Sequence, residues 1–276
     1  MEWTAIVALA SIAAGFLGSM MGIGGGVIIV PTLAGLLGVD IRLAVGASLV
    51  AVTATSSAAA TAFVRDNLTN VRLAIFLESA TTSGAVIGVI VGSHVPKNIL
   101  AMLFIMVLIF AAYNIFRRRH ANHLPVGSGG DWERRLQLSG SYVDESTGQT
   151  IDYGMRHIPL GWFFMVLAGM MSGMLGIGAG VLKVPTMDAA MGLPAKASSA
   201  TSNFMIGVTA ASGAVTMYFM GYVNPLLTAP VVMGVFIGSV AGSRLMPKVK
   251  DGRIRLLFVI VLLAAALEMV IKQFKG

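Results

Sequence analysis

The stretch Gly22-Ile-Gly-Gly-Gly-Val-Ile-Ile-Val-Pro-Thr32 occurs a second time, 154 positions later, as Gly176-Ile-Gly-Ala-Gly-Val-Leu-Lys-Val-Pro-Thr186. Each copy lies inside a long apolar run. A further pattern is also duplicated, because Gly84-x-x-x-Gly88-x-x-x-Gly92-Ser93 returns as Gly234-x-x-x-Gly238-x-x-x-Gly242-Ser243. The chain therefore consists of two copies of one unit. Apolar segments interrupted by glycine and proline at matching places in two halves point to a transporter's binding site.

The composition indicates a membrane protein. Of the 276 residues, 56% are hydrophobic and 11% are charged, and the mean hydropathy is +0.84. The apolar runs approach or exceed the roughly 20 residues that a membrane-spanning helix needs, and they lack the strict alternation of a membrane β-barrel. We predict an all-α polytopic membrane protein in the cell inner membrane. Apart from the two glycine-containing runs, the candidate spans are 41–64, 73–95, 99–116, 197–218, 226–246 and 254–271.

Three regions follow from the repeat. Residues 1–117 and 158–276 are the two transmembrane repeats, and each is predicted to have a re-entrant or discontinuous first helix followed by three transmembrane helices. Residues 118–157 form the one extended polar stretch, and strand-like segments around a polar turn predict a β-hairpin within 136–153. The repeated Gly-x-x-x-Gly patterns are interpreted as seams where helix backbones pack closely.

Charge and residue types exclude several functions. The net charge of +7 resides mainly in loops between spans, so topology explains it better than a nucleic-acid partner does. Without cysteine, disulfides and thiolate metal sites are excluded. The histidines of the polar stretch, His120, His123 and His157, lack acidic or thiol partners. We therefore predict no metal and no cofactor, and no pairing of nucleophile and base indicates an enzyme.

The loop Lys and Arg residues indicate how the halves are oriented. If each glycine-containing run crosses the membrane once, these residues divide almost evenly between the two faces. If each run instead enters and leaves on one side, or crosses twice, only Arg42, Lys97, Lys272 and Lys275 share one face, and the other loop cations share the opposite face. The positive-inside rule favours the second arrangement. It predicts inverted repeats with both termini outside and a cytoplasmic central loop.

The glycine blocks are predicted to break the helices at membrane depth. Consecutive glycines weaken a helix, and Pro31 and Pro185 then suit the first turn of a new helix, so a short second helix is expected to begin near each proline. Free amide groups at such a break, with the positive end of a half-helix, can bind an anion. Two inverted copies would direct two breaks at one central point. The alternative is that the glycines only permit a kink and tight packing.

Lys183 distinguishes the second copy, because Ile29 occupies the matching position of the first. A lysine among apolar residues costs at least about 2.5 to 3.5 kcal/mol on membrane-insertion scales, so it should face a cavity or a partner. One candidate partner is Asp188, five residues further on; the other is a bound anion.

Polar side chains near the start of the span at 197–218 are further candidate ligands. Ser202 and Asn203, with Ser48 as the counterpart in the first half, can donate hydrogen bonds to an oxyanion. Asn203 could equally join two helices. Glu78 is a candidate for proton coupling, and Glu268 is expected to pair with Lys272 one turn later.

These blocks and ladders resemble the TauE/SafE sulfite exporter family of membrane permeases, and the resemblance covers both halves but not the central loop. It implies transport of small sulfur-containing anions, and small carboxylates for some relatives. The second block departs from the pattern at Ala179, which carries a methyl group where the matching Gly25 of the first block has a hydrogen. The predicted substrate-binding residues are Gly24, Gly25, Gly26, Pro31, Thr32, Ser48, Gly178, Ala179, Gly180, Lys183, Pro185, Thr186, Ser202 and Asn203.

The expected function is secondary transport of sulfite or an organosulfonate by alternating access. An anion channel and a carrier for small carboxylates are the alternatives. The expected partners are the lipid bilayer and the small anion. The oligomeric state stays open, and a homo-oligomer is compatible with the sequence.

The topology can be tested with reporters fused to the chain. One reporter functions only outside the cytoplasm, and we expect activity when it is fused at Gly276. A second reporter functions only in the cytoplasm, and we expect activity when it is inserted in the 118–157 loop. Cytoplasmic activity at Gly276 would contradict the inverted-repeat topology.

Overall fold

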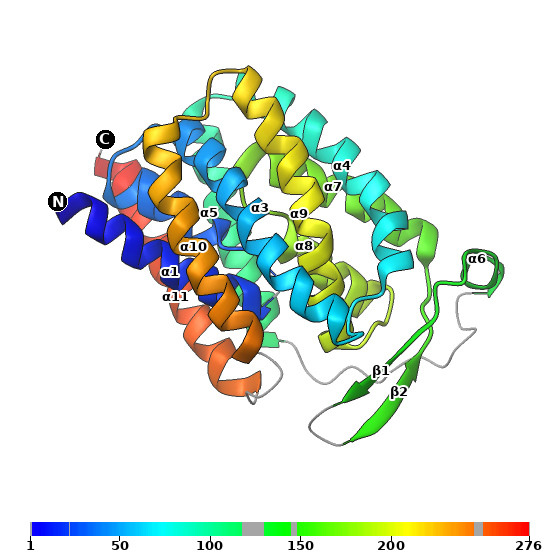
Figure 1. Ribbon diagram of the computed structural model, residues 1–276. Coiled ribbons are helices and arrows are strands. Elements are labelled where there is room, and N and C mark those ends of the chain that lie inside the picture. The colour runs from blue at the N-terminus through cyan, green and yellow to red at the C-terminus, as the bar shows by residue number, and fades with distance from the viewer. Residues whose placement is uncertain (1, 22, 118–129, 145–147, 246–250, 276) are drawn as a thin grey trace.

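The computed structural model describes residues 2–21, 23–117, 130–144, 148–245 and 251–275, which form a bundle of helices with a small β-hairpin at one edge (Figure 1). The predicted all-α polytopic membrane fold is confirmed. Five described helices are long and apolar enough to cross a membrane, namely 41–65, 71–94, 97–114, 158–175 and 225–245. Shorter apolar stretches cover 7–20, 26–36 and 259–271.

The two halves have the same order of helices. The first contains α1 (Glu2–Met21), α2 (Gly26–Val30), the π-helical segment η1 (Pro31–Leu36), α3 (Ile41–Arg65), α4 (Val71–His94) and α5 (Lys97–Arg117). The second contains α7 (Ile158–Leu175), α8 (Gly180–Pro185), the π-helical segment η2 (Thr186–Ala190), α9 (Ala195–Phe219), α10 (Pro225–Leu245) and α11 (Asp251–Lys275).

The first helix of each half packs against the other half. A Cβ built on Gly88 of α4 would lie 2.1 Å from the Met170 carbonyl oxygen of α7, and one on Gly84 would lie 2.2 Å from the Val166 oxygen. The same pattern joins α10 to α1, where a Cβ built on Gly238 would lie 2.0 Å from the Ile12 carbonyl oxygen. Only glycine permits such an approach of two backbones. The interpretation of both glycine ladders as packing seams is confirmed.

These contacts also define the helix directions. Along each seam the contacting residue numbers rise together, so α4 is parallel to α7 and α10 is parallel to α1. The helices α3 and α9 run in opposite directions, because Gly46 near the start of α3 lies against Tyr222 just beyond α9, while Ser56 contacts Asn203 near the start of α9. Short turns reverse the chain between α3 and α4 and between α9 and α10 (Figure 1). Matching helices of the two halves therefore run in opposite directions.

The polar stretch contains α6 (Gly130–Leu136) and the strands β1 (Gly140–Asp144) and β2 (Gln149–Tyr153). The strands pair antiparallel, with Gly140 opposite Tyr153, which confirms the predicted hairpin. Asn70, at the start of α4, holds this region to both halves. Its side-chain amide donates to the Leu138 carbonyl at 2.7 Å, and its backbone N–H donates to the Thr201 hydroxyl of α9 at 3.0 Å.

The outer surface of the bundle suits a lipid bilayer. Large apolar side chains are exposed on α4, α5 and α10, including Ile75, Met102, Met233 and Phe236. Many exposed large apolar side chains on helices of this length suit contact with lipid. The membrane location is therefore supported by the faces of the helices as well as by their lengths.

The seam between α1 and α10 predicts the effect of one added methyl group. Gly238→Ala should lower the free energy of unfolding by about 1–3 kcal/mol, because its Cβ would overlap backbone atoms of α1. Gly213→Ala is the matched control, since its nearest neighbour is the flexible end of Leu49 at 3.2 Å. Thermal unfolding of both variants in detergent measures the difference. Equal effects would contradict the seam.

Candidate functional site

Both glycine blocks interrupt a helix. In the first, α1 ends at Met21 and helix resumes only at Gly26; Gly24 between them has a φ of +77°. In the second, α7 ends at Leu175, and Gly176 and Gly178 have φ values of +70° and +75°. These left-handed conformations favour glycine. The predicted breaks are therefore present, although Gly22 lies outside the described residues.

The short second helices begin earlier than predicted. They were expected to start near Pro31 and Pro185, but α2 starts at Gly26 and α8 starts at Gly180. Pro31 begins η1 and Pro185 ends α8, so each proline leads into a π-helical segment. Proline has no N–H to donate, and its ring crowds the preceding turn of helix. Each proline therefore widens a helix that has already begun into a π-helical segment, and does not start a new helix.

The threonines after these prolines bond within their own helices. The Thr32 hydroxyl donates to the Ile28 carbonyl and the Thr186 hydroxyl donates to the Leu182 carbonyl, each at 2.8 Å. Each hydroxyl thus bonds a carbonyl one turn earlier in a region that proline disturbs. A role of either threonine in substrate binding stays a prediction, and it would require the hydroxyl to change partner.

Ala179 makes the two breaks unequal. It is fully buried and has a left-handed φ of 60°, whereas its counterpart Gly25 has a φ of −74°. An alanine in this conformation costs roughly 1–2 kcal/mol. The backbone of the second break is therefore held in a strained turn by its surroundings, at the position where the chain departs from the repeat.

The two breaks meet in the centre of the bundle. A Cβ on Gly26 would lie 2.3 Å from the Gly176 carbonyl oxygen, and the buried Ser48 hydroxyl donates to that oxygen at 2.7 Å. Two further side chains, Val52 of α3 and Ile206 of α9, touch both blocks. A Cβ on Gly24 would lie 3.1 Å from Val52, and one on Gly178 would lie 2.7 Å from it. The structure thus brings the two glycine blocks together, as the sequence predicted.

Lys183 is fully buried, and its partner is Glu78. The Lys183 ammonium lies 3.4 Å from the Glu78 carboxylate across 105 residues of chain, and the two side chains are 0% and 10% exposed. The suggested pair with Asp188 is not the one that forms. Lys183 also donates to the Thr209 hydroxyl, which donates to Glu78 at 2.6 Å. Glu78 therefore joins α4 of the first half to α8 and α9 of the second.

Threonines surround the carboxylate. Thr82 donates to Glu78 at 2.8 Å, and Thr81 lies 3.2 Å from the Thr209 hydroxyl oxygen. Thr81, Thr209 and Lys183 are all fully buried. Lys183, Glu78, Thr81, Thr82 and Thr209 form one hydrogen-bonded group, which we call the charged cluster.

The matching positions of the other half carry no charge. By the offsets of the repeat, Ile29 corresponds to Lys183, Thr55 to Thr209, and Thr228 to Glu78. The Thr55 hydroxyl donates to the Ala51 carbonyl of its own helix, at 3.0 Å. The two halves therefore share one order of helices, but the residues of the charged cluster have no charged counterparts at the matching positions.

The other polar candidates hold helices together. The Asn203 amide donates to the Ser19 carbonyl of α1 at 3.1 Å and to the Ser199 carbonyl at 3.2 Å, so it does join two helices. Its side-chain oxygen is buried with no hydrogen-bond partner among the described atoms. Ser202, the counterpart of Ser48, is fully buried. Asn203 and Ser48 thus lie beside the ends of α1 and α7, where the breaks begin.

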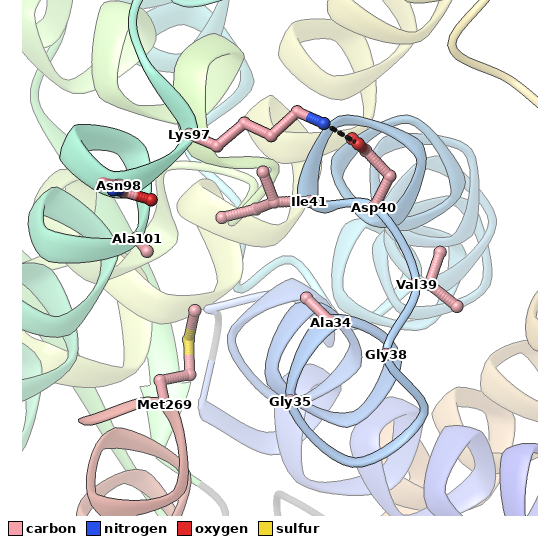
Figure 2. Close-up of a pocket in the computed structure, with 10 residues that line it drawn as sticks. All are labelled: Ala34, Gly35, Gly38, Val39, Asp40, Ile41, Lys97, Asn98, Ala101 and Met269. Carbon is pink, nitrogen blue, oxygen red and sulfur yellow. Dashed lines mark hydrogen bonds and ion pairs between the residues drawn. The ribbon is translucent and has the colours of Figure 1, made fainter. Parts of the chain in front are cut away.

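A cavity of about 340 Å³ lies beside η1 and the loop that leads into α3, and it was not predicted (Figure 2). At its rim, Lys97 pairs with Asp40, which also accepts from the Arg42 N–H at 2.9 Å. Burial raises the pKa of the Asp40 carboxyl, but the hydrogen bonds and charges of Lys97 and Arg42 outweigh it and hold the pKa below its usual value. The cavity is lined by Ala34, Gly35, Gly38, Val39, Asp40, Ile41, Lys97, Asn98, Ala101 and Met269.

The remaining candidates do not join the centre. Glu268 lies against η1, where a Cβ on Gly35 would fall 2.1 Å from its carboxylate oxygen; the Lys272 side chain expected to pair with it is outside the described residues. His157 precedes α7 in a left-handed conformation, and His120 and His123 are also outside the described residues. The described residues contain no group of three potential metal ligands.

Comparisons with known proteins agree with the membrane fold. Residues 7–269 match the sequence profile of the family described as "Sulfite exporter TauE/SafE". The chain is also 25% identical over 272 residues to the "Probable membrane transporter protein YunE" of Bacillus subtilis (strain 168), with 96% of each chain covered. No solved structure matches the chain.

The Lys183–Glu78 pair predicts unequal effects of single and double substitution. Lys183→Ala should lower the free energy of unfolding by about 3–5 kcal/mol, because it leaves the Glu78 carboxylate uncompensated. Lys183→Met combined with Glu78→Gln removes both charges at similar volume and should stay close to the wild type. Thermal unfolding in detergent measures both variants. Additive losses in the double variant would contradict the pairing.

Proposed function

We propose that this chain, a membrane transporter that belongs to the sulfite exporter TauE/SafE family, carries a small sulfur-containing oxyanion by alternating access. The substrate is sulfite or an organosulfonate, and the site lies where the two glycine blocks meet. The observation that carries the proposal is Lys183, the one buried cation among the described residues, which follows directly after the second break.

The surroundings of Lys183 suit an oxyanion. A sulfite or sulfonate group presents oxygen acceptors, and the cluster supplies an ammonium group together with threonine hydroxyls from two other helices. The backbone amides of Gly25 and Gly26 and of Gly178 to Gly180 belong to the two breaks, and Ser48, Ser202 and Asn203 lie on the flanking helices; the Gly24 N–H is already used, because it donates to the Gly18 carbonyl at 3.3 Å. All of these donors lie inside the bundle, so the substrate reaches them only when the halves move apart.

The two ends of the bundle support alternating access. Beside η1, the cavity of about 340 Å³ opens next to the loop 37–40, which is partly exposed. The matching loop 191–194 beyond η2 is buried, and Met191 and Leu193 are fully covered. The Arg156 N–H donates to the Met191 carbonyl at 2.9 Å, so the chain leading into α7 closes that end. This difference favours a carrier with one side open over a continuous pore.

The proposed topology places the cavity on the outer face, together with Arg42 and Lys97. The central loop with its hairpin then lies in the cytoplasm, and the closed end is the cytoplasmic one. A channel would require a continuous path, and a carrier for carboxylates would use the same ammonium and hydroxyl groups. Both remain outcomes of the transport experiment.

Transport can be measured with purified protein in proteoliposomes. Labelled sulfite and labelled methanesulfonate should show saturable uptake, and unlabelled anion loaded inside should accelerate it, because a carrier exchanges its substrate. The folded double variant Lys183→Met with Glu78→Gln should bind the anion at least about tenfold more weakly, since it loses a charged hydrogen bond.

Three results would redirect the proposal. Flux that neither saturates nor responds to internal anion would identify a channel. Stronger competition by acetate or oxalate than by the sulfur anions would identify a carboxylate carrier. Wild-type affinity in the double variant would remove Lys183 from the site.

A further inference from the structure

We propose that the charged cluster couples the anion to a proton: Glu78 takes up a proton when the anion displaces it from Lys183, so one proton moves with each anion. This inference rests on the proposed anion site at Lys183 and adds to it the coupling ion. It makes the carrier an electroneutral anion–proton symporter.

The geometry sets up a competition for one ammonium group. Lys183 and Glu78 are 3.4 Å apart with side-chain exposures of 0% and 10%, so neither charge is balanced by bulk water. In this state the pair is neutral overall, and Lys183 has no net charge to offer an anion. An anion that binds Lys183 must therefore either displace the carboxylate or find it already neutral.

Charge balance selects the protonated carboxyl group. With an ionised Glu78 and a bound monovalent anion, two negative charges would share one ammonium in a protein interior, where such interactions are weakly screened. A carboxyl group beside a second negative charge gains a proton readily. The empty site then holds Lys183⁺ with Glu78⁻, and the loaded site holds Lys183⁺, the anion and neutral Glu78. Both states carry the same net charge, because the proton and the anion enter together.

Thr209 can serve both states. Its hydroxyl lies between the two charged groups, accepting from Lys183 and donating to Glu78 at 2.6 Å. Once Glu78 is neutral, the same hydroxyl can rotate and donate to an oxygen of the anion, while the protonated carboxyl can donate in turn. Thr82, which also donates to Glu78, remains as a second partner for the carboxyl group.

The neighbouring elements leave Glu78 as the central proton acceptor. The helix α7, packed along α4, has no Asp, Glu, Lys or Arg between Ile158 and Leu175. The other ionisable groups of α4 and of the elements around α4 and α8 are Asp188 on η2, Lys196 and Tyr218 at the two ends of α9, Arg72 and His94 at the ends of α4, His157 before α7, and Lys97, Tyr113 and Arg117 on α5. Among the described residues, Lys183 is the only charged group that pairs with Glu78.

The repeat limits the stoichiometry to one. The positions that match Lys183 and Glu78 are Ile29 and Thr228, neither of which can hold a charge. A single cluster therefore serves both orientations of the carrier, and one proton accompanies one monovalent anion.

The test uses proteoliposomes with an imposed pH gradient and the membrane potential clamped at zero. The probe is labelled methanesulfonate, which stays ionised; if only sulfite is carried, labelled sulfite is used with uptake into protein-free vesicles subtracted. A gradient of one pH unit, acid outside, should accumulate the anion about tenfold inside the wild-type vesicles. An imposed potential without a pH gradient should cause no accumulation.

Glu78→Gln should reverse both responses. Its empty site carries the uncompensated charge of Lys183, so transport should ignore the pH gradient and follow the membrane potential, with about tenfold accumulation for roughly 60 mV, inside positive. Glu133→Gln is the matched control, because Glu133 is a buried glutamate of α6, outside the bundle, whose Oε1 accepts from Ser139 at 2.8 Å. This control should behave like the wild type.

The outcomes separate the two proposals. Saturable wild-type uptake with no response to the pH gradient would overturn proton coupling and leave the anion carrier intact, and this result needs no variant to fold. A pH response that persists in folded Glu78→Gln would remove Glu78 from the coupling. Absence of saturable uptake for every anion tested would instead overturn the proposed function.

Discussion

The constraint on which the structure depends is that broken backbone cannot face lipid. Between α1 and α2, and again between α7 and α8, peptide groups leave the helical ladder inside a bundle of apolar helices. In hydrocarbon each unsatisfied group would cost several kcal/mol, so protein must cover it. Here each break is covered by the other, since Gly26 lies against Gly176 and the Ser48 hydroxyl bonds the Gly176 carbonyl. One half alone would leave its break uncovered, which explains why the unit occurs in pairs.

Mutual covering requires the halves to interleave. The first helix of each half packs on the penultimate helix of the other, and both seams depend on glycines that let backbones approach. The contacts between α3 and α9 complete the arrangement, with Val52 and Ile206 at matching positions touching both breaks. Interleaving also brings residues that are distant in the chain together. Glu78 and Lys183 belong to different halves, and they meet because α4 crosses into the second half.

The features that the sequence predicted are those with local or repeated signals. Apolar runs, spacing of four between glycines and the duplicated block predicted the helices, the packing seams and the meeting of the breaks. The start of each short helix was missed, because Gly26 and Pro31 both suit a helix start and nothing local chooses between them. The partner of Lys183 was also missed. Proximity in the chain favoured Asp188, whereas Glu78 is 105 residues away and becomes a neighbour only through the crossed packing. A carboxylate inside another apolar run was the available signal.

The symmetry of the backbone and the asymmetry of the charges have different consequences. Because the halves share one backbone plan in opposite directions, the proposed alternating access would exchange the conformations of the matching segments at the two ends. A charged cluster repeated in both halves would place two ammonium groups and two carboxylates around one centre, and every unpaired state would leave a charge without compensation. With Ile29 and Thr228 at the matching positions, the cluster holds a single ion pair, which both orientations of the proposed carrier would use. In the proposed mechanism the repeat would supply the movement, and Lys183 and Glu78, where its symmetry is lost, would supply the chemistry.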